Sequence, residues 1–278
     1  MLPTHYERPL QLSDSDLRFV VQTVATERQD HEHIVELVRD KPDILNVMLD
    51  DEKLFRRLIE DEEALVMISP WLLFSILLRR AVKQLGEERF TIERIGATDR
   101  IPVFDTDRVF NLMRDPKLQD YLVAMLASFV RTESTTVWYR SGRHIRRRSY
   151  SDLDVDDMIS MAGRVDPEQR FPFYRRIGDI CLFIVGMFPE YVLAGYAPGA
   201  GVQSPLRWGR MRRSLPDYEI EARRFYRLAA SQAQAQQMGL SSVLTTLAEH
   251  FELARKPLNL ISDRYLRLQK GRLFGQAN

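Results

Sequence analysis

Apolar residues recur at helical spacing along most of the chain. Leu17, Val20 and Val24 follow the i, i+3, i+7 pattern of one helix face, and Ser13 stands three residues before Asp16, as in an N-terminal capping motif. The sequence therefore predicts an all-α fold, a helical bundle or array. The same periodicity predicts further helices in five segments: 34–38, 44–49, 54–59, 71–85 and 118–130.

Two longer apolar segments follow in the second half. The segment that starts near Phe173 is apolar nearly all round, which is typical of a central buried helix. The segment 244–268 keeps apolar residues three or four apart, and Pro257 interrupts it, so we expect two helices or one kinked helix. Its apolar face packs against the chain's own bundle or, alternatively, forms an interface with a protein partner or a second copy.

One segment breaks the helical pattern. Residues 135–150 begin with β-forming side chains, and Ser141-Gly142 is a turn signal, which together predict a β-hairpin. A two-residue turn at these positions pairs Arg140 with Arg143 and Tyr139 with His144. Shorter strands are expected at 91–95 and 101–104.

The length of 278 residues allows one large domain or two. The less regular segment 87–107 is the candidate boundary, which gives an acidic helical subdomain at 1–95 and a basic subdomain with the hairpin at 96–278. One continuous domain is the alternative.

Charge is unevenly distributed along the chain. The formal net charge is +1, yet residues 1–135 carry 18 basic and 25 acidic side chains, a net −7, and the remainder carries +8. Such asymmetry indicates either two halves that attract each other or an anionic partner.

Basic residues gather in the predicted hairpin and after a glycine-rich segment. Arginine binds phosphate and carboxylate groups in a bidentate manner, and aromatic neighbours allow stacking, so nucleic acid or another polyanion is one possible partner. The alternatives are acidic groups of this chain or of a protein partner, and simple solvation. The candidate anion-binding residues are Arg140, Arg143, His144, Arg146, Arg147, Arg148, Arg207, Arg210, Arg212 and Arg213.

Familiar motifs for cofactors and metals are missing from the sequence. The segment 195–201 lacks the ending of a phosphate-binding loop, and the acidic run at 152–157 departs from the calcium-loop pattern, so it is better explained as the start of a helix. We expect no metal and no cofactor. The single cysteine, Cys181, lies in an apolar run, and neither a signal peptide nor a membrane span is predicted, so a cytoplasmic location is expected.

A single carboxylate stands within the predicted central helix. Asp179 follows Gly178 there, and a buried carboxylate needs a partner or a shifted pKa, so we expect an ion pair with an arginine or, alternatively, a functional group. The surrounding residues resemble a pattern found in uncharacterised bacterial helical proteins, and this resemblance implies no activity. The resemblance covers about twenty residues and the later Phe225-Tyr226. Within the twenty, the residues that carry it are Tyr174, Gly178, Asp179, Leu182, Phe183, Gly186 and Phe188.

Three functions remain open from the sequence. Many helices, a basic hairpin and no catalytic motif favour a non-enzymatic interaction or regulatory protein. A nucleic-acid or polyanion binder that uses the arginine-rich hairpin is the second hypothesis, and an enzyme that uses Asp179 is the third.

Overall fold

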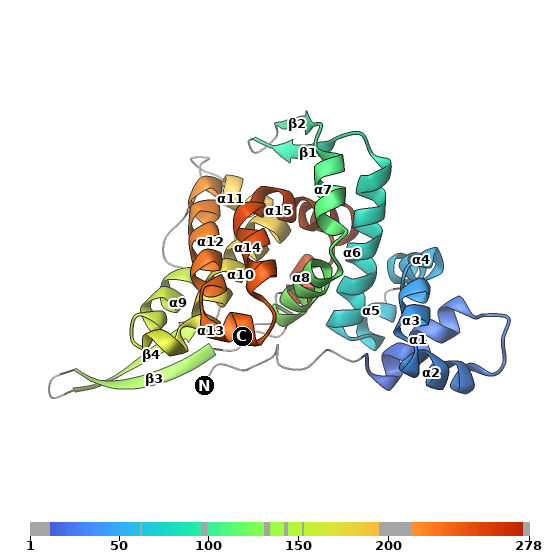
Figure 1. The fold of residues 1–278 in the computed structure, drawn as a ribbon, viewed down its shortest axis with the longest axis horizontal. Coiled ribbons are helices and arrows are strands. Elements are labelled where there is room, and N and C mark those ends of the chain that lie inside the picture. The colour runs from blue at the N-terminus through green and yellow to red at the C-terminus, as the bar shows by residue number, and fades with distance from the viewer. Residues whose placement is uncertain are drawn as a thin grey trace.

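The computed structural model confirms the all-α class (Figure 1). It describes residues 12–61, 63–95, 99–130, 134–141, 144–151, 153–194 and 213–274, and of the strands at 134–151 it describes the backbone pairing alone. Helices dominate these residues, together with two antiparallel sheets of two strands each. No helix in this part of the chain combines the length and the apolar character needed to cross a membrane.

The N-terminal helices form a small group at one side of the molecule (Figure 1). As predicted, Ser13 caps the first helix: its Oγ accepts from the Asp16 N–H at 3.1 Å, and the Asp16 carboxylate accepts from the Ser13 N–H at 3.2 Å. Asp16 also accepts from the Ser69 N–H at 2.8 Å and so joins this group to the next helix. The helices are α1 (Asp14–Val24), α2 (His31–Asp40), α3 (Pro42–Leu49), α4 (Glu52–Glu60) and α5 (Ala64–Met67).

Helix α6 (Pro70–Glu87) connects this group to the rest of the chain, because it packs against α4 on one side and against α7 (Thr106–Met113) and α8 (Pro116–Ser128) on the other. The buried apolar residues form one cluster that extends from Leu17 to Phe274. The predicted division after residue 95 stays a prediction, and it falls between the two strands of the first sheet.

The first sheet confirms the short strands expected near residue 100. Strand β1 (Thr91–Arg94) pairs with β2 (Arg100–Val103), with Ile92 opposite Pro102 and Arg94 opposite Arg100. This β1–β2 hairpin stands at the top of Figure 1, beside α7.

The second sheet confirms the predicted hairpin and corrects its register. Strand β3 (Ser134–Ser141) pairs with β4 (His144–Ser151), so that Ser141 is opposite His144 and Arg140 is opposite Ile145. The predicted pairing of Arg140 with Arg143 is wrong, and so is that of Tyr139, which pairs with Arg146. Arg140 therefore has an apolar residue, and not another arginine, as its cross-strand partner.

Helix α10 (Phe171–Met187) is the predicted central helix, and α9 (Val155–Ala162), α12 (Leu215–Ala230) and α15 (Phe251–Leu260) pack against it. Two glycines allow the close approach. A Cβ atom at Gly178 would lie 2.7 Å from the ring of Tyr226 on α12, and one at Gly186 would lie 2.8 Å from the side chain of Leu258 on α15. The 3₁₀ helix η1 (Pro167–Gln169) precedes α10, and α11 (Pro189–Ala194) follows it.

The C-terminal helices correct the expected break at Pro257. The chain turns at His250, between α14 (Ser241–Glu249) and α15, whereas Pro257 lies inside α15. A π-helix, η2 (Ile261–Tyr265), continues α15, and α13 (Ala233–Gln237) and α16 (Lys270–Phe274) complete the fold.

The apolar face predicted at 244–268 as a possible partner interface is largely buried within this chain, from Leu244 to Ile261. Leu268 is 92% exposed. Any contact with another protein through this face is therefore limited to its C-terminal end.

Aromatic rings join the C-terminal helix to the core. The Phe274 ring lies 5.0 Å from that of Phe183, 5.9 Å from that of Phe188 and 6.0 Å from that of Phe74, centroid to centroid. Such pairs stabilise beyond the area that they bury. The last described helix therefore closes the core around α10.

Candidate functional site

A charged cavity of about 400 Å³ lies between the β1–β2 hairpin, the C-terminal end of α6, the start of α11 and the segment from α15 to α16. This volume is typical of ligand pockets, which span ~300–1,000 Å³. Its apolar lining residues are Leu85, Ile92 and Leu260. Its polar and charged lining residues are Glu88, Thr91, Arg94, Arg100, Glu190, Lys256, Asn259, Asp263, Arg264, Arg267 and Lys270.

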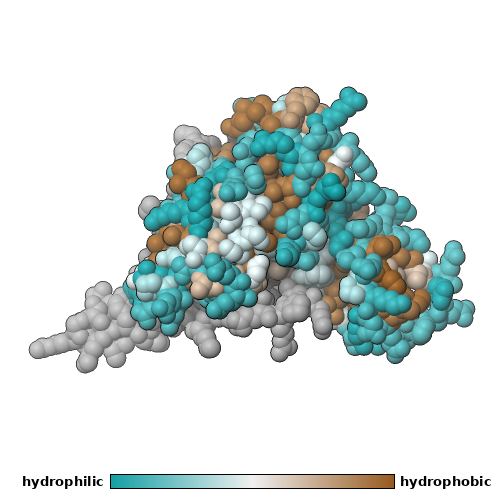
Figure 2. Space-filling model, in the orientation of Figure 1, coloured by the Kyte–Doolittle hydropathy of each residue, from teal (hydrophilic) through white to brown (hydrophobic). Residues whose placement is uncertain are grey.

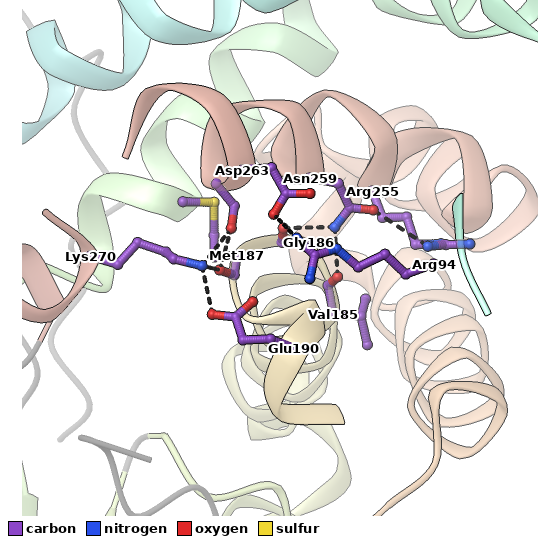
Figure 3. A network of polar contacts seen from close by, with 10 residues as sticks. Arg94, Val185, Gly186, Met187, Glu190, Arg255, Asn259, Asp263 and Lys270 are labelled. Atoms are coloured by element: carbon purple, nitrogen blue, oxygen red, sulfur yellow. Dashed lines mark hydrogen bonds and ion pairs between the residues drawn. The ribbon is translucent and has the colours of Figure 1, made fainter. Parts of the chain in front are cut away.

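The side chains beside this cavity hold the C-terminal end of α10 (Figure 3). Asn259 Nδ2 donates to the carbonyl oxygens of residues 185 and 186 at 2.9 and 2.8 Å. Ser262 Oγ and Lys270 Nζ both donate to the carbonyl of Met187, at 2.7 and 3.0 Å. The last carbonyls of a helix lack partners within the helix and favour a nearby cation. These three residues therefore cap α10 from a distant part of the chain.

The π-helix η2 supplies part of the wall. Asp263 and Arg264, both within it, line the cavity, and its Ser262 is one of the caps of α10. Single-turn π-helices inside α-helical segments are frequent at functional sites. Here the wider turn lets neighbouring residues reach both the cavity and the end of α10.

Lys256 is buried in the wall among acidic groups. Its Nζ lies 2.7 Å from Glu93 Oε1 and donates to Thr91 Oγ1 at 3.0 Å and to the Asp105 carboxylate. Thr91 Oγ1 in turn donates to Asp105 Oδ1 at 2.7 Å. A buried ammonium group is tolerated only when it is paired and hydrogen-bonded, so this cluster fixes β1 and the start of α7 against α15.

Two further ion pairs fasten the β1–β2 hairpin region to the C-terminal segment. Arg94 lies 2.7 Å from Asp263 in η2, and Arg264 lies 2.5 Å from Glu88 at the end of α6. Charged contacts therefore hold this hairpin at several points around the cavity.

The cavity lining has an excess of positive charge. Six of its residues are cationic and three are carboxylates, a net +3. Two of the cations, Arg100 and Arg267, are exposed and have no carboxylate partner among the residues that the structure describes. A guanidinium group can donate two parallel hydrogen bonds to two oxygens of a carboxylate or phosphate group. Arg100 and Arg267 can therefore hold an anionic group.

Asp179 is fully buried but is not among the residues that line this cavity. Its Oδ1 accepts from the hydroxyls of Tyr121 at 2.7 Å and Tyr226 at 2.9 Å, and neither partner was predicted from the sequence. Burial raises the pKa of Asp179, and the charge of Arg175 acts against that rise. This carboxylate therefore links α8, α10 and α12 in the core.

Arg213 is the predicted anion-binding residue whose side chain the structure describes. It makes a bidentate ion pair with Asp156 on α9, at 2.5 and 3.2 Å. An acidic group of the chain itself thus occupies it. Arg143, Arg207, Arg210 and Arg212 lie outside the described residues, as do the side chains of Arg140, His144, Arg146, Arg147 and Arg148.

The cavity was not predicted from the sequence, although one signal for it exists. Polar residues recur at spacings of three or four in the C-terminal segment, at Lys256, Asn259, Asp263, Arg267 and Lys270. Such a stripe usually marks a solvated helix face. Here all five residues line the cavity.

The comparisons with known proteins identify no relative. No protein-family model, no curated protein and no solved structure matches the chain. Within the described part of the chain, no group of three His, Cys, Asp or Glu residues could hold a metal ion.

Proposed function

We propose that this chain is a non-enzymatic interaction or regulatory protein that recognises an anionic group in the charged cavity. The observation that supports this most is the pair of exposed arginines at its edge, Arg100 and Arg267, which no carboxylate of the described chain neutralises. The other lining cations are committed to Glu88, Glu93, Asp105, Glu190 and Asp263.

The arrangement favours binding because the cavity wall around Arg100 and Arg267 is already held in place. Ion pairs at 2.7 Å from Arg94 to Asp263 and from Lys270 to Glu190 fix the wall, so an incoming anion meets donors that need little reordering. The excess of positive charge in the lining also raises the local concentration of anions.

Titration of the purified full-length chain with inorganic phosphate tests the proposal. Binding to the folded state raises the midpoint of thermal unfolding, so phosphate is expected to stabilise the wild type more than chloride does at equal ionic strength. The double variant Arg100→Ala/Arg267→Ala should lose this difference. A matched control replaces Arg56 and Arg227, which are exposed and lie outside the cavity, and should keep it.

An equal response of the wild type and the cavity double variant to phosphate would contradict the proposal. So would the absence of any response specific to phosphate. Isothermal titration calorimetry on the same proteins gives the affinity directly and separates binding from a change in intrinsic stability.

A second candidate function is polyanion binding through β3 and β4. These strands extend away from the helices as a ribbon (Figure 1), and they carry Arg140 and residues 146–148. Binding to a polyanion releases counterions, so retention on heparin should fall steeply with salt. Replacement of Arg143, Arg146 and Arg148 together by Ala should reduce that retention, and unchanged retention would exclude this function.

We also propose a cytoplasmic location. The only cysteine, Cys181, is buried and free, which suits a compartment that keeps thiols reduced. Fluorescence microscopy of a tagged chain, with cell fractionation as a control, tests this location.

A further inference from the structure

The β1–β2 hairpin exposes large apolar side chains next to the charged cavity. Phe104 is 78% exposed, Ile92 is 45% exposed and Phe90 is 40% exposed, and the rings of Phe90 and Phe104 lie 5.9 Å apart. Hydrophobic residues are visible at the top of the molecule, where this hairpin stands (Figure 2). Ion pairs hold the hairpin against the helices. The exposed apolar side chains are therefore available to contact another molecule.

The register of the hairpin connects the apolar groups to the arginines. Ile92 pairs with Pro102 and Arg94 pairs with Arg100, and residues two apart on a strand share a face. One face of the hairpin therefore continues from Ile92 and Pro102 to the two arginines, and Ile92, Arg94 and Arg100 all line the cavity. Phe90 and Phe104 flank the other end of the strands.

The distribution of charge indicates the shape of the partner. Residues 87–108 contain six acidic and four basic side chains, but three of the carboxylates, those of Glu88, Glu93 and Asp105, are paired with cations of the C-terminal segment. The positive excess lies in the recess, where Arg264, Arg267 and Lys270 come from the C-terminal segment. Because this positive charge lines a cavity beside the exposed apolar residues, a carboxylate side chain that projects from a protein segment can enter it while apolar neighbours of that carboxylate contact the hairpin.

From these observations we infer that this hairpin face and the cavity together bind a protein segment in which an acidic residue is flanked by apolar residues. The inference rests on the proposed function and names its partner class. The carboxylate of the segment pairs with Arg100 and Arg267. Its apolar side chains cover Ile92, Phe90 and Phe104. Burial of the apolar side chains supplies affinity, and the ion pairs with the arginines fix the position of the bound segment along the hairpin face.

Selection from a random peptide library displayed on phage, with the full-length chain as bait, tests the inference. We expect enriched peptides to share Asp or Glu with at least two apolar residues nearby. Fluorescence anisotropy with a labelled enriched peptide then measures the variants. Phe104→Ser and Arg100→Ala/Arg267→Ala should each weaken binding about tenfold or more, as is typical of central interface residues.

Matched controls lie elsewhere on the surface. Ile220→Ser removes an apolar side chain on α12 that is 64% exposed, and Arg227→Ala removes an exposed arginine. Both should bind the peptide as the wild type does. Circular dichroism confirms that each variant is folded, which is expected because all the replaced side chains are exposed.

Each other outcome decides against the inference. If no peptide is enriched, or if basic peptides are, the partner class is wrong. If Phe104→Ser binds normally while the arginine variant does not, the apolar contact is wrong and the proposed anion recognition stands. Sedimentation with vesicles of equal parts phosphatidylcholine and phosphatidylserine is the last arm. Binding there that needs both Phe104 and the arginines would identify a membrane surface instead.

Discussion

Replacement of Gly178 by Ala tests how closely α10 and α12 pack. A Cβ atom at this position would lie 2.7, 2.7 and 2.9 Å from three ring atoms of Tyr226. Carbon atoms in contact are separated by about 3.5–4.0 Å, so the ring or the helix has to move by roughly 0.8 Å or more. Tyr226 has little freedom to move, because it is fully buried and its hydroxyl donates to Asp179 at 2.9 Å.

The magnitude follows from three contributions. Overpacking of a well-packed core costs about 1–3 kcal/mol, and a weakened hydrogen bond to Asp179 costs about 1 kcal/mol more. The higher helix propensity of Ala returns about 1 kcal/mol. Gly178→Ala should therefore lower the free energy of unfolding by about 1–3 kcal/mol, measured by urea denaturation.

Gly271→Ala is the matched control, since a Cβ atom at this position in α16 has no atom within 4 Å. It should leave stability unchanged or raise it by up to about 1 kcal/mol. If Gly178→Ala were as stable as the wild type, the close contact between Gly178 and Tyr226 would not constrain the two helices, and the reasoning would be wrong.

Three further predictions concern buried charge and the β1–β2 hairpin. Burial raises the pKa of Asp179, so the folded state binds the proton of this carboxyl group more tightly than the unfolded state does. Stability therefore falls as the pH rises above about 4, the ordinary pKa of an aspartate side chain. Asp179→Asn should flatten that part of the dependence of unfolding free energy on pH, and an unchanged slope would contradict the assignment. Lys256→Met leaves the carboxylates of Glu93 and Asp105 without their ammonium partner and should cost about 3–5 kcal/mol in urea denaturation, whereas a loss below about 1 kcal/mol would contradict the pairing. Salt should accelerate amide hydrogen exchange in β1 and β2 more than in α10, because screening weakens the ion pairs that hold this hairpin, and equal acceleration would show that other contacts hold it.

Local signals predicted most of the secondary structure. The predicted capping motif of Ser13 with Asp16 is present, because caps depend on residues within one turn. The central helix was recognisable because its burial on all sides leaves no polar face. The break at His250 was missed because a proline inside an apolar segment suggests an interruption more strongly than a histidine does.

The register of β3 and β4 shows a limit of prediction from the periodicity of side chains. The observed partner of Tyr139 is Arg146, two residues from the predicted His144. A shift of two keeps the same residues on the same face, so alternation of side chains cannot distinguish the two registers.

The cavity could not be predicted from the sequence, for a different reason. Its lining comes from residues 85–100, from Glu190 and from residues 256–270, which only the tertiary fold brings together. A polar stripe on a helix is the same in sequence whether it faces solvent or a recess.

The dependence of α10 on residues 259–270 also orders events during synthesis. When α10 has left the ribosome, its last carbonyls still lack Asn259, Ser262 and Lys270, and the aromatic cluster still lacks Phe274. The central helix can therefore reach its final packing only after the C-terminal helices have emerged. A nascent chain stalled before residue 259 would expose apolar surface to chaperones and proteases, so even a short C-terminal truncation acts on the whole core.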